Sequence, residues 1–248
     1  MSRLWKTGLS REVCFAICTL ITLNTHAMGQ ADAHTLKGQQ QARKTTYASG
    51  QVYLKNSRVY VYVGKTGLGH EHGVVGRLRQ GTIQLGVDQN AGQIVFDMTS
   101  FKADTAKARQ YVGLSGSTDD ATKRKVNANM RGPSVLNIQK YPTALFTIES
   151  SQPLSSKSKQ GFPQYRLDGK LTLHGVAQPV SITADAEPKG GWIHLRGGFS
   201  LLQTSYGITP FSKAFGAVGI TDQLKIWGDI WIAGPQGVTV TIPSTQKQ

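Results

Sequence analysis

Apolar and polar residues alternate with a period of two over much of this chain, and this pattern limits the folds open to it. In residues 165–173, Tyr-Arg-Leu-Asp-Gly-Lys-Leu-Thr-Leu, the odd positions are apolar or glycine and all of the even ones are polar. Side chains alternate between the two faces of a strand, so such a segment forms a half-buried β-strand. Similar segments recur along the chain.

The other alternating segments have apolar rows of the same kind. They include Val59, Val61 and Val63; Ile83, Leu85 and Val87; Ile94, Phe96 and Met98; Phe146 and Ile148; Val180, Ile182 and Ala184; Ile193, Leu195, Phe199 and Leu201; Leu224, Ile226, Ile230 and Ile232; and residues 238–242. Eight or nine strands are therefore available, which predicts an all-β sandwich or closed barrel.

One internal segment lacks this alternation and predicts a helical excursion between strands. Residues 103–111 and 118–130 carry Ala, Lys, Arg and Met without a period of two, and Ser117 is placed to start a helix. Gly132 and Pro133 should end it. The excursion either covers one mouth of a barrel or is a plain surface connection.

The N-terminus has the features of a cleaved export signal. Basic residues precede a short apolar run at 13–23, which is too short to span a bilayer, and a Thr-His-Ala end follows at 25–27. We expect residues 1–27 to be a signal peptide, which places the protein in the periplasm or outside the cell. Cys14 and Cys18 would leave with it, so thiol catalysis and thiolate metal sites are not expected.

Residues 28–50 are rich in Gln, Ala and Thr and are expected to be a flexible leader, with one folded domain over 51–248. The whole chain has 28 Lys and Arg against 14 Asp and Glu, a net charge of +14. Such a field favours transient contact with an anionic membrane surface. Because no dense Lys/Arg tract occurs, nucleic acid is not expected as a partner. Whether the chain forms oligomers stays open.

Two motifs in the second half carry a resemblance to a known family. They are Gln-Lys-Tyr-Pro-Thr-Ala-Leu-Phe at 139–146 and Leu-Asp-Gly-Lys-Leu-Thr-Leu-His-Gly-Val-Ala-Gln-Pro-Val at 167–180. Val-Phe-Asp-Met-Thr-Ser at 95–100 precedes them and Ser-Tyr-Gly-Ile-Thr-Pro at 205–210 follows. In this order they resemble the YceI family of bacterial exported proteins. The basic, Asn-rich stretch at 123–129 departs from the family pattern.

The resemblance implies an eight-stranded, antiparallel, lipocalin-like barrel with a helical insertion. It also implies a non-enzymatic carrier whose lumen holds a polyisoprenoid, an isoprenoid quinone or a similar lipid, with no other cofactor. The expected lumen residues are the apolar and glycine positions of four strands: Tyr165, Leu167, Gly169, Leu171, Leu173, Val180, Ile182, Ile193, Leu195, Gly197, Phe199, Leu201, Leu224, Ile226, Gly228 and Ile230.

Gly169, Gly197 and Gly228 each lie near the middle of an apolar row. They leave room for a ligand, or they allow strands to coil in a barrel. The apolar rows themselves fit a filled core as well as a lumen.

The alternative function is a metal-binding protein or metal-dependent enzyme built on His70 and His72. Residues i and i+2 of a strand point to one side and can chelate a divalent ion, with His174 as a third candidate. No metal is expected, because two ligands do not make a site and His174 is better placed to cap a hairpin. Gly113-Leu-Ser-Gly116 lacks the full nucleophile elbow of a hydrolase, so no catalytic residue is assigned.

Overall fold

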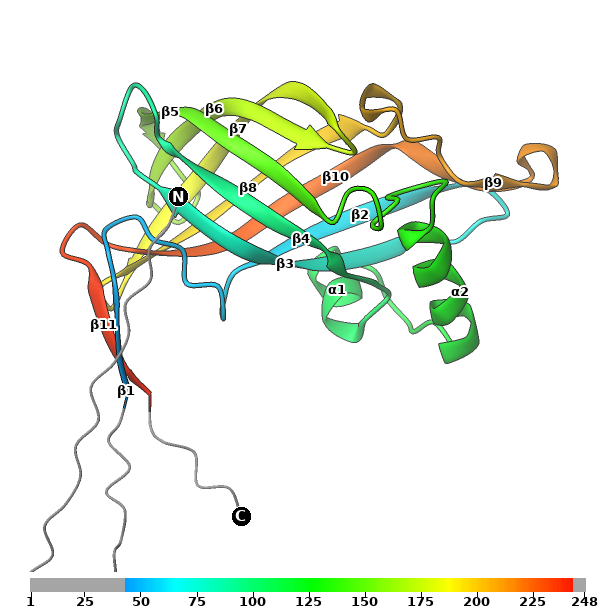
Figure 1. The fold of residues 1–248 in the computed structure, drawn as a ribbon, viewed down its shortest axis with the longest axis horizontal. Coiled ribbons are helices and arrows are strands. Elements are labelled where there is room, and N and C mark those ends of the chain that lie inside the picture. The colour runs from blue at the N-terminus through cyan, green and yellow to red at the C-terminus, as the bar shows by residue number, and fades with distance from the viewer. Residues whose placement is uncertain (1–42, 243–248) are drawn as a thin grey trace, which may run out of the picture. The chain divides into compact units, whose positions relative to one another are not determined.

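The computed structural model describes residues 43–242, and the expected signal peptide at 1–27 lies outside them. Eight antiparallel strands form a closed ring, because β2 pairs with β10 as well as with β3. The ring consists of β2 (Arg58–Gly67), β3 (His72–Ile83), β4 (Gly92–Ala103), β5 (Thr143–Lys157), β6 (Pro163–Leu173), β7 (Val176–Lys189), β8 (Trp192–Leu202) and β10 (Val218–Ala233). The predicted eight-stranded barrel is confirmed (Figure 1).

The connections alternate between the two ends of the ring. We call one end the open end: it carries the β2–β3 loop, the helices, the β6–β7 turn and the segment 203–217 (Figure 1). The other, the closed end, carries the β3–β4, β5–β6 and β7–β8 connections. His174 and Gly175 form the two-residue β6–β7 turn with φ of 53° and 80°. Both central residues of a type I′ hairpin turn need positive φ, so His174 caps a hairpin as expected.

The helical excursion is present and leaves from the open end. It consists of α1 (Ala106–Tyr111) and α2 (Asp120–Arg131). The caps are Thr105 and Asp119, whose side chains accept from the backbone N–H groups of Ala108 and Thr122, so Ser117 does not start α2. Gly132 ends α2, as the sequence predicts. None of the described helices is long and apolar enough to cross a membrane.

The structure differs from the expected leader at residues 43–50. Here β1 (Arg43–Tyr47) pairs with β11 (Val238–Ile242) in a two-stranded ribbon separate from the ring. Tyr47 makes edge contacts with Tyr53 and Trp192, at 5.4 and 5.1 Å between ring centroids. A partner strand far along the chain and an aromatic cluster therefore order a segment that has no apolar periodicity of its own.

Short elements complete the open end. They are β9 (Ser212–Lys213), which pairs with β10, and the 3-10 turns η1 (Thr204–Tyr206) and η2 (Ala214–Gly216). Ala214, Phe215 and Gly216 all have positive φ, and Phe215 is fully exposed. This tip thus presents an aromatic ring to solvent.

Candidate functional site

The barrel encloses a cavity of about 250 Å³ that reaches the open end. Its wall is made of the inward rows of the strands, since alternate residues of each strand point to the axis. In β2, for example, Val59, Val61 and Val63 line the cavity, while Tyr62 between them donates a hydrogen bond to Glu71 at 2.6 Å. The apolar character of the cavity wall therefore follows from the alternation in the sequence.

The cavity wall is apolar except at three side chains. Among the described residues that line it, only His72, Asn129 and Gln203 carry polar side chains. All three belong to the open end: His72 begins β3, Gln203 follows β8, and Asn129 lies in α2 after β4. A ligand in the cavity would therefore meet hydrocarbon along its length and polar groups at one end.

The closed end is filled by large aliphatic side chains. Val52, Ile83, Ile148 and Ile232 are each at most 2% exposed. The segment before β2 crosses this end, where the Val52 N–H donates to the Gly81 carbonyl and the Ala233 N–H to the Gln51 carbonyl. The cavity consequently has no comparable polar group at this end among residues 43–242.

Eleven of the sixteen expected lumen residues line the cavity: Leu167, Leu171, Leu173, Ile182, Leu195, Gly197, Phe199, Leu224, Ile226, Gly228 and Ile230. The other five do not. Tyr165, Val180, Ile193 and Leu201 belong to or pack against the hydrophobic core, and Gly169 lies against β5. Alternation gives the face of a residue but not its depth, so it does not separate core from cavity.

The three central glycines have different surroundings. A Cβ at Gly169 would overlap the Thr147 carbonyl oxygen, and one at Gly197 would lie 2.8 Å from the Thr183 carbonyl oxygen. These two glycines allow close approach of neighbouring strands. A Cβ at Gly228 would meet only Ile230, at 3.3 Å, so among the three Gly228 alone leaves space in the cavity.

Several cavity residues were not among the expected lumen residues. The rows of β2, β4 and β5 supply Val61, Phe96 and Phe146, and the alternation of these strands in the sequence is the signal that marks them. From α2, Val126, Asn129 and Met130 also face the cavity. Their spacing of i, i+3 and i+4 marks one face of a helix, and this spacing is the feature of the sequence that indicates them. The helical excursion thus covers part of the open end.

His72 is held at the rim of the cavity by a buried carboxylate. Its Nδ1 lies 2.7 Å from Oδ2 of Asp104, which is 1% exposed. Asp104 also accepts from the Gly73 N–H at 3.3 Å, from Arg109 at 3.2 Å and from the Thr118 hydroxyl at 3.1 Å. A buried charge needs such compensation, and here four donors provide it.

This network keeps the Asp104 carboxylate ionised and sets which ring nitrogen of His72 faces it. Burial alone would raise the pKa of Asp104, but the hydrogen bonds from His72, Gly73 and Arg109 outweigh it and hold the pKa below its ordinary value. The carboxylate is therefore ionised at neutral pH and accepts the hydrogen bond. It follows that Nδ1 of His72 carries a proton, and that its Nε2 faces away from Asp104.

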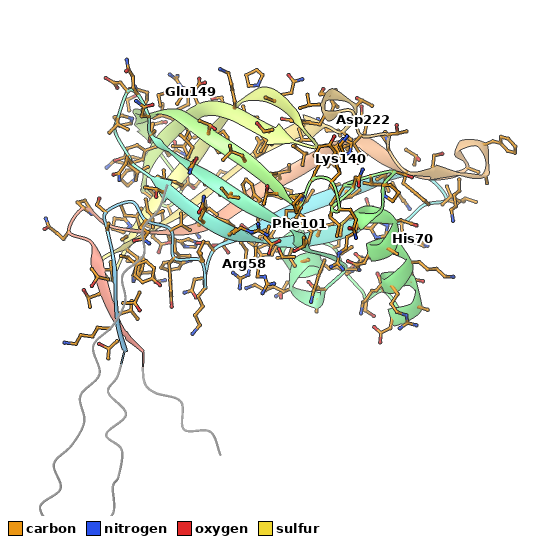
Figure 2. All side chains as sticks on the ribbon, in the orientation of Figure 1. Arg58, His70, Phe101, Lys140, Glu149 and Asp222 are labelled. Carbon is orange, nitrogen blue, oxygen red and sulfur yellow. The ribbon has the colours of Figure 1, made fainter. Side chains whose placement is uncertain are left out.

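A second, polar recess adjoins the cavity at the open end, and His72 lines both. The polar recess is lined by Lys65, His70, Glu71, His72, Arg109, Ser117, Thr118, Asp119 and Thr122. Figure 2 shows His70 beside α2, in agreement with this lining. The apolar cavity is thus continuous with a polar recess whose side chains can form hydrogen bonds.

The three candidate metal ligands do not form a cluster. His70 is exposed, His72 is bonded to Asp104, and the His174 ring packs on Tyr141 at 4.5 Å. Within residues 43–242, no group of three or more His, Cys, Asp or Glu side chains is placed to hold a metal ion.

Known proteins resemble this chain in sequence. UPF0312 proteins of Pectobacterium atrosepticum and Yersinia pseudotuberculosis are each 29% identical over 110 residues, which are 44% of this chain and 52% of the relative. The chain thus spans about half the length of the curated relatives it matches.

Solved structures that match this chain have low sequence identity to it. Burkholderia cenocepacia BcnA is 15% identical with a TM-score of 0.49, and the match covers 73% of this chain and 99% of that one. A polyisoprenoid binding domain from Saccharophagus degradans, implicated in plant cell wall breakdown, is 12% identical with a TM-score of 0.49, covering 75% and 98%.

The family assignment rests on the sequence match. The family model described as the YceI-like domain matches residues 51–230, which include all eight ring strands except the end of β10. This chain belongs to the YceI family.

Proposed function

We propose that this protein is a non-enzymatic carrier that holds an isoprenoid-type lipid in the barrel. The observation that carries the proposal is the cavity, whose wall is apolar except for three side chains at its open end. A polyisoprenoid or isoprenoid-quinone tail has no hydrogen-bonding groups, so it matches such a wall. Each methylene unit withdrawn from water contributes about 0.8 kcal/mol, which is enough for tight binding without a charged anchor. Membership of the YceI family agrees with this function.

The test is identification of the ligand that the protein carries from its own host. Protein purified without detergent is extracted with organic solvent and the extract analysed by mass spectrometry. We expect a stoichiometric isoprenoid lipid. Elemental analysis of the same sample examines the metal alternative, since a stoichiometric metal without lipid would contradict the proposal. Protein that has been unfolded, stripped and refolded is the matched blank.

Export is part of the proposal, and it rests on the pattern of residues 1–27. A carrier outside the cytoplasm would begin at Met28. N-terminal sequencing of protein from cell fractions tests this, and a periplasmic or secreted form that retains Cys14 and Cys18 would contradict it.

We further propose that the open end contacts an anionic membrane to load and release lipid. Two apolar tips project there: Leu68 is 81% exposed, and Phe215 is fully exposed. The Leu68 N–H donates to the Ala217 carbonyl at 2.9 Å, which ties the two tips together. Segments 64–72, 102–131 and 203–218 at this end hold nine Lys and Arg against four Asp and Glu. Apolar tips surrounded by basic residues can insert into a bilayer while the basic residues attract its anionic head groups.

A further inference from the structure

The second ring nitrogen of His72 has no assigned role in the fold. We propose that Nε2 of His72 is the hydrogen-bonding anchor for a hydroxyl head group on the carried lipid, an inference that rests on the proposed carrier function. The ligand class is then an isoprenoid alcohol, such as a polyprenol or a quinol, rather than a bare hydrocarbon or a prenyl phosphate.

The strand pairing aims His72 at the cavity. His72 lies two residues before Val74, an inward residue of β3, and its partner on β2 is Val63, which also lines the cavity. It is therefore the first inward position of β3 after the β2–β3 loop. Its side chain is only 13% exposed, so a group bonded to it would be largely shielded from water. Hydrogen bonds in such surroundings discriminate more strongly than exposed ones.

The Asp104 contact orients the ring and leaves Nε2 available. Since Nδ1 donates to Asp104, the neutral ring has its lone pair on Nε2, and none of the described residues makes a hydrogen bond to that atom. A fixed tautomer with one free nitrogen is the arrangement that a ligand-binding histidine needs. A hydroxyl suits it in either charge state, because it can donate to the neutral ring or accept from the protonated one.

The charges around the polar recess disfavour a phosphate. Glu71 and Asp119 line it, and Asp104 lies directly behind His72. Of the two cationic side chains in the lining, Arg109 already donates to Asp104 and to the backbone carbonyls of Glu71, Ser115 and Gly116. Lys65 alone would face an anionic head group beside two carboxylates. An uncharged head avoids this repulsion.

The two ends of the barrel then fix the direction of the ligand. Ile83, Ile148 and Ile232 fill the closed end, so the tail points toward them. The head lies at the open end between β3 and α2, where His72, Asn129 and Gln203 are the polar side chains of the cavity wall.

The experiment uses an exchange that keeps the Asp104 contact. In His72→Asn the side-chain amide can still donate to Asp104 from the place of Nδ1, but nothing replaces Nε2. In His72→Gln the amide instead reaches the place of Nε2 and the Asp104 contact is lost. Gln110→Asn, at an exposed side chain of α1 that lines neither the cavity nor the polar recess, is the matched control. Thermal unfolding of each ligand-free variant shows that it is folded.

Affinity is measured for three probes with one tail: geranylgeraniol, the corresponding hydrocarbon without the hydroxyl, and geranylgeranyl phosphate. The native protein should bind the alcohol more tightly than the other two. His72→Asn should lower the affinity for the alcohol by about two- to tenfold, which is the range of one net hydrogen bond. The affinity for the hydrocarbon should not change. His72→Gln should keep the preference for the alcohol, and Gln110→Asn should bind all three probes as the native protein does.

The outcomes separate this inference from the carrier function. If the native protein binds none of the probes, the proposed function fails with it. If all three bind but His72→Asn changes alcohol and hydrocarbon equally, His72 is structural and only the anchor is refuted. If the native protein binds geranylgeranyl phosphate more tightly than geranylgeraniol, the preference for an uncharged head group is refuted.

Discussion

Tyr60 and Tyr111 stack with their ring centroids 3.6 Å apart and their planes 7° from parallel. Tyr60 lies on the outer face of β2 and is fully buried, and Tyr111 is the last residue of α1. The stack fastens α1 to the outside of the barrel. The loop after α1 carries Thr118, whose hydroxyl donates to Asp104. The tyrosine stack therefore also helps to hold the open end in place.

The Tyr111 ring makes stability sensitive to alkaline pH. Burial, followed by the nearby Asp229 and Tyr60, raises the pKa of Tyr111 to about 12, above the ordinary value of about 10. A raised pKa means that the folded protein holds the proton more tightly, so this stabilisation is complete below about pH 10 and is lost between about pH 10 and 12. Denaturant unfolding should show a smaller loss over this window in Tyr111→Phe than in the native protein. Equal losses would contradict a raised pKa of Tyr111 in the folded protein.

Asp104 should control stability in acid. Removing one partner from a buried ion pair is strongly destabilising, so we expect Asp104→Asn to lower the free energy of unfolding by about 3 kcal/mol at neutral pH. The lowered pKa of Asp104 means that its stabilisation is present above the unfolded value of about 4 and is lost as the pH falls through the folded value.

The difference between native protein and Asp104→Asn should therefore shrink below about pH 4. Denaturant unfolding across this range measures it. Asp120→Asn is the control, because that side chain is 85% exposed and its exchange should stay within about 0.5 kcal/mol at every pH. A constant difference down to about pH 2 would argue against an ionised Asp104 in the folded protein.

Gly228→Leu should weaken lipid binding more than it weakens the fold. The new side chain would enter the cavity, where its nearest neighbour is Ile230, and displace at least two methylene units of ligand at about 0.8 kcal/mol each. We expect a loss of affinity of about tenfold or more. Titration with geranylgeraniol and thermal unfolding of the ligand-free protein measure the two effects.

Gly169→Ala is the matched comparison. Its Cβ would overlap the Thr147 carbonyl oxygen of the neighbouring strand, so the fold should lose about 1–3 kcal/mol, while the cavity keeps its shape. If both glycine variants alter stability and affinity in the same proportion, the space at Gly228 is not occupied by ligand.

The apolar tips of the open end should determine membrane contact. Leu68→Ser with Phe215→Ser should reduce binding to vesicles that contain anionic lipid and slow lipid transfer to them, because both tips lose the apolar area that enters the bilayer. Affinity for a soluble short-chain isoprenoid should not change. Leu54→Ser, at an exposed leucine before β2, is the control. Unchanged vesicle binding in the double variant would rule out this docking surface.

The sequence by itself determined the class of fold. Rows such as Val59, Val61 and Val63 alternate because each half-buried strand must show one face to the interior and the other to solvent, and that requirement is local. The helical excursion and its end at Gly132 were equally readable, since capping and loss of alternation are properties of neighbouring residues.

Only the tertiary structure decided the chemistry of the mouth. His72 and Asp104 are 32 residues apart, and their contact depends on β3 and β4 pairing so that Val74 lies opposite Ala103. The roles of Gly169 and Gly228 likewise depend on neighbouring strands and on the depth of each residue in the barrel. A period of two gives the face of a side chain, but long-range pairing and closure of the ring decide what that side chain meets.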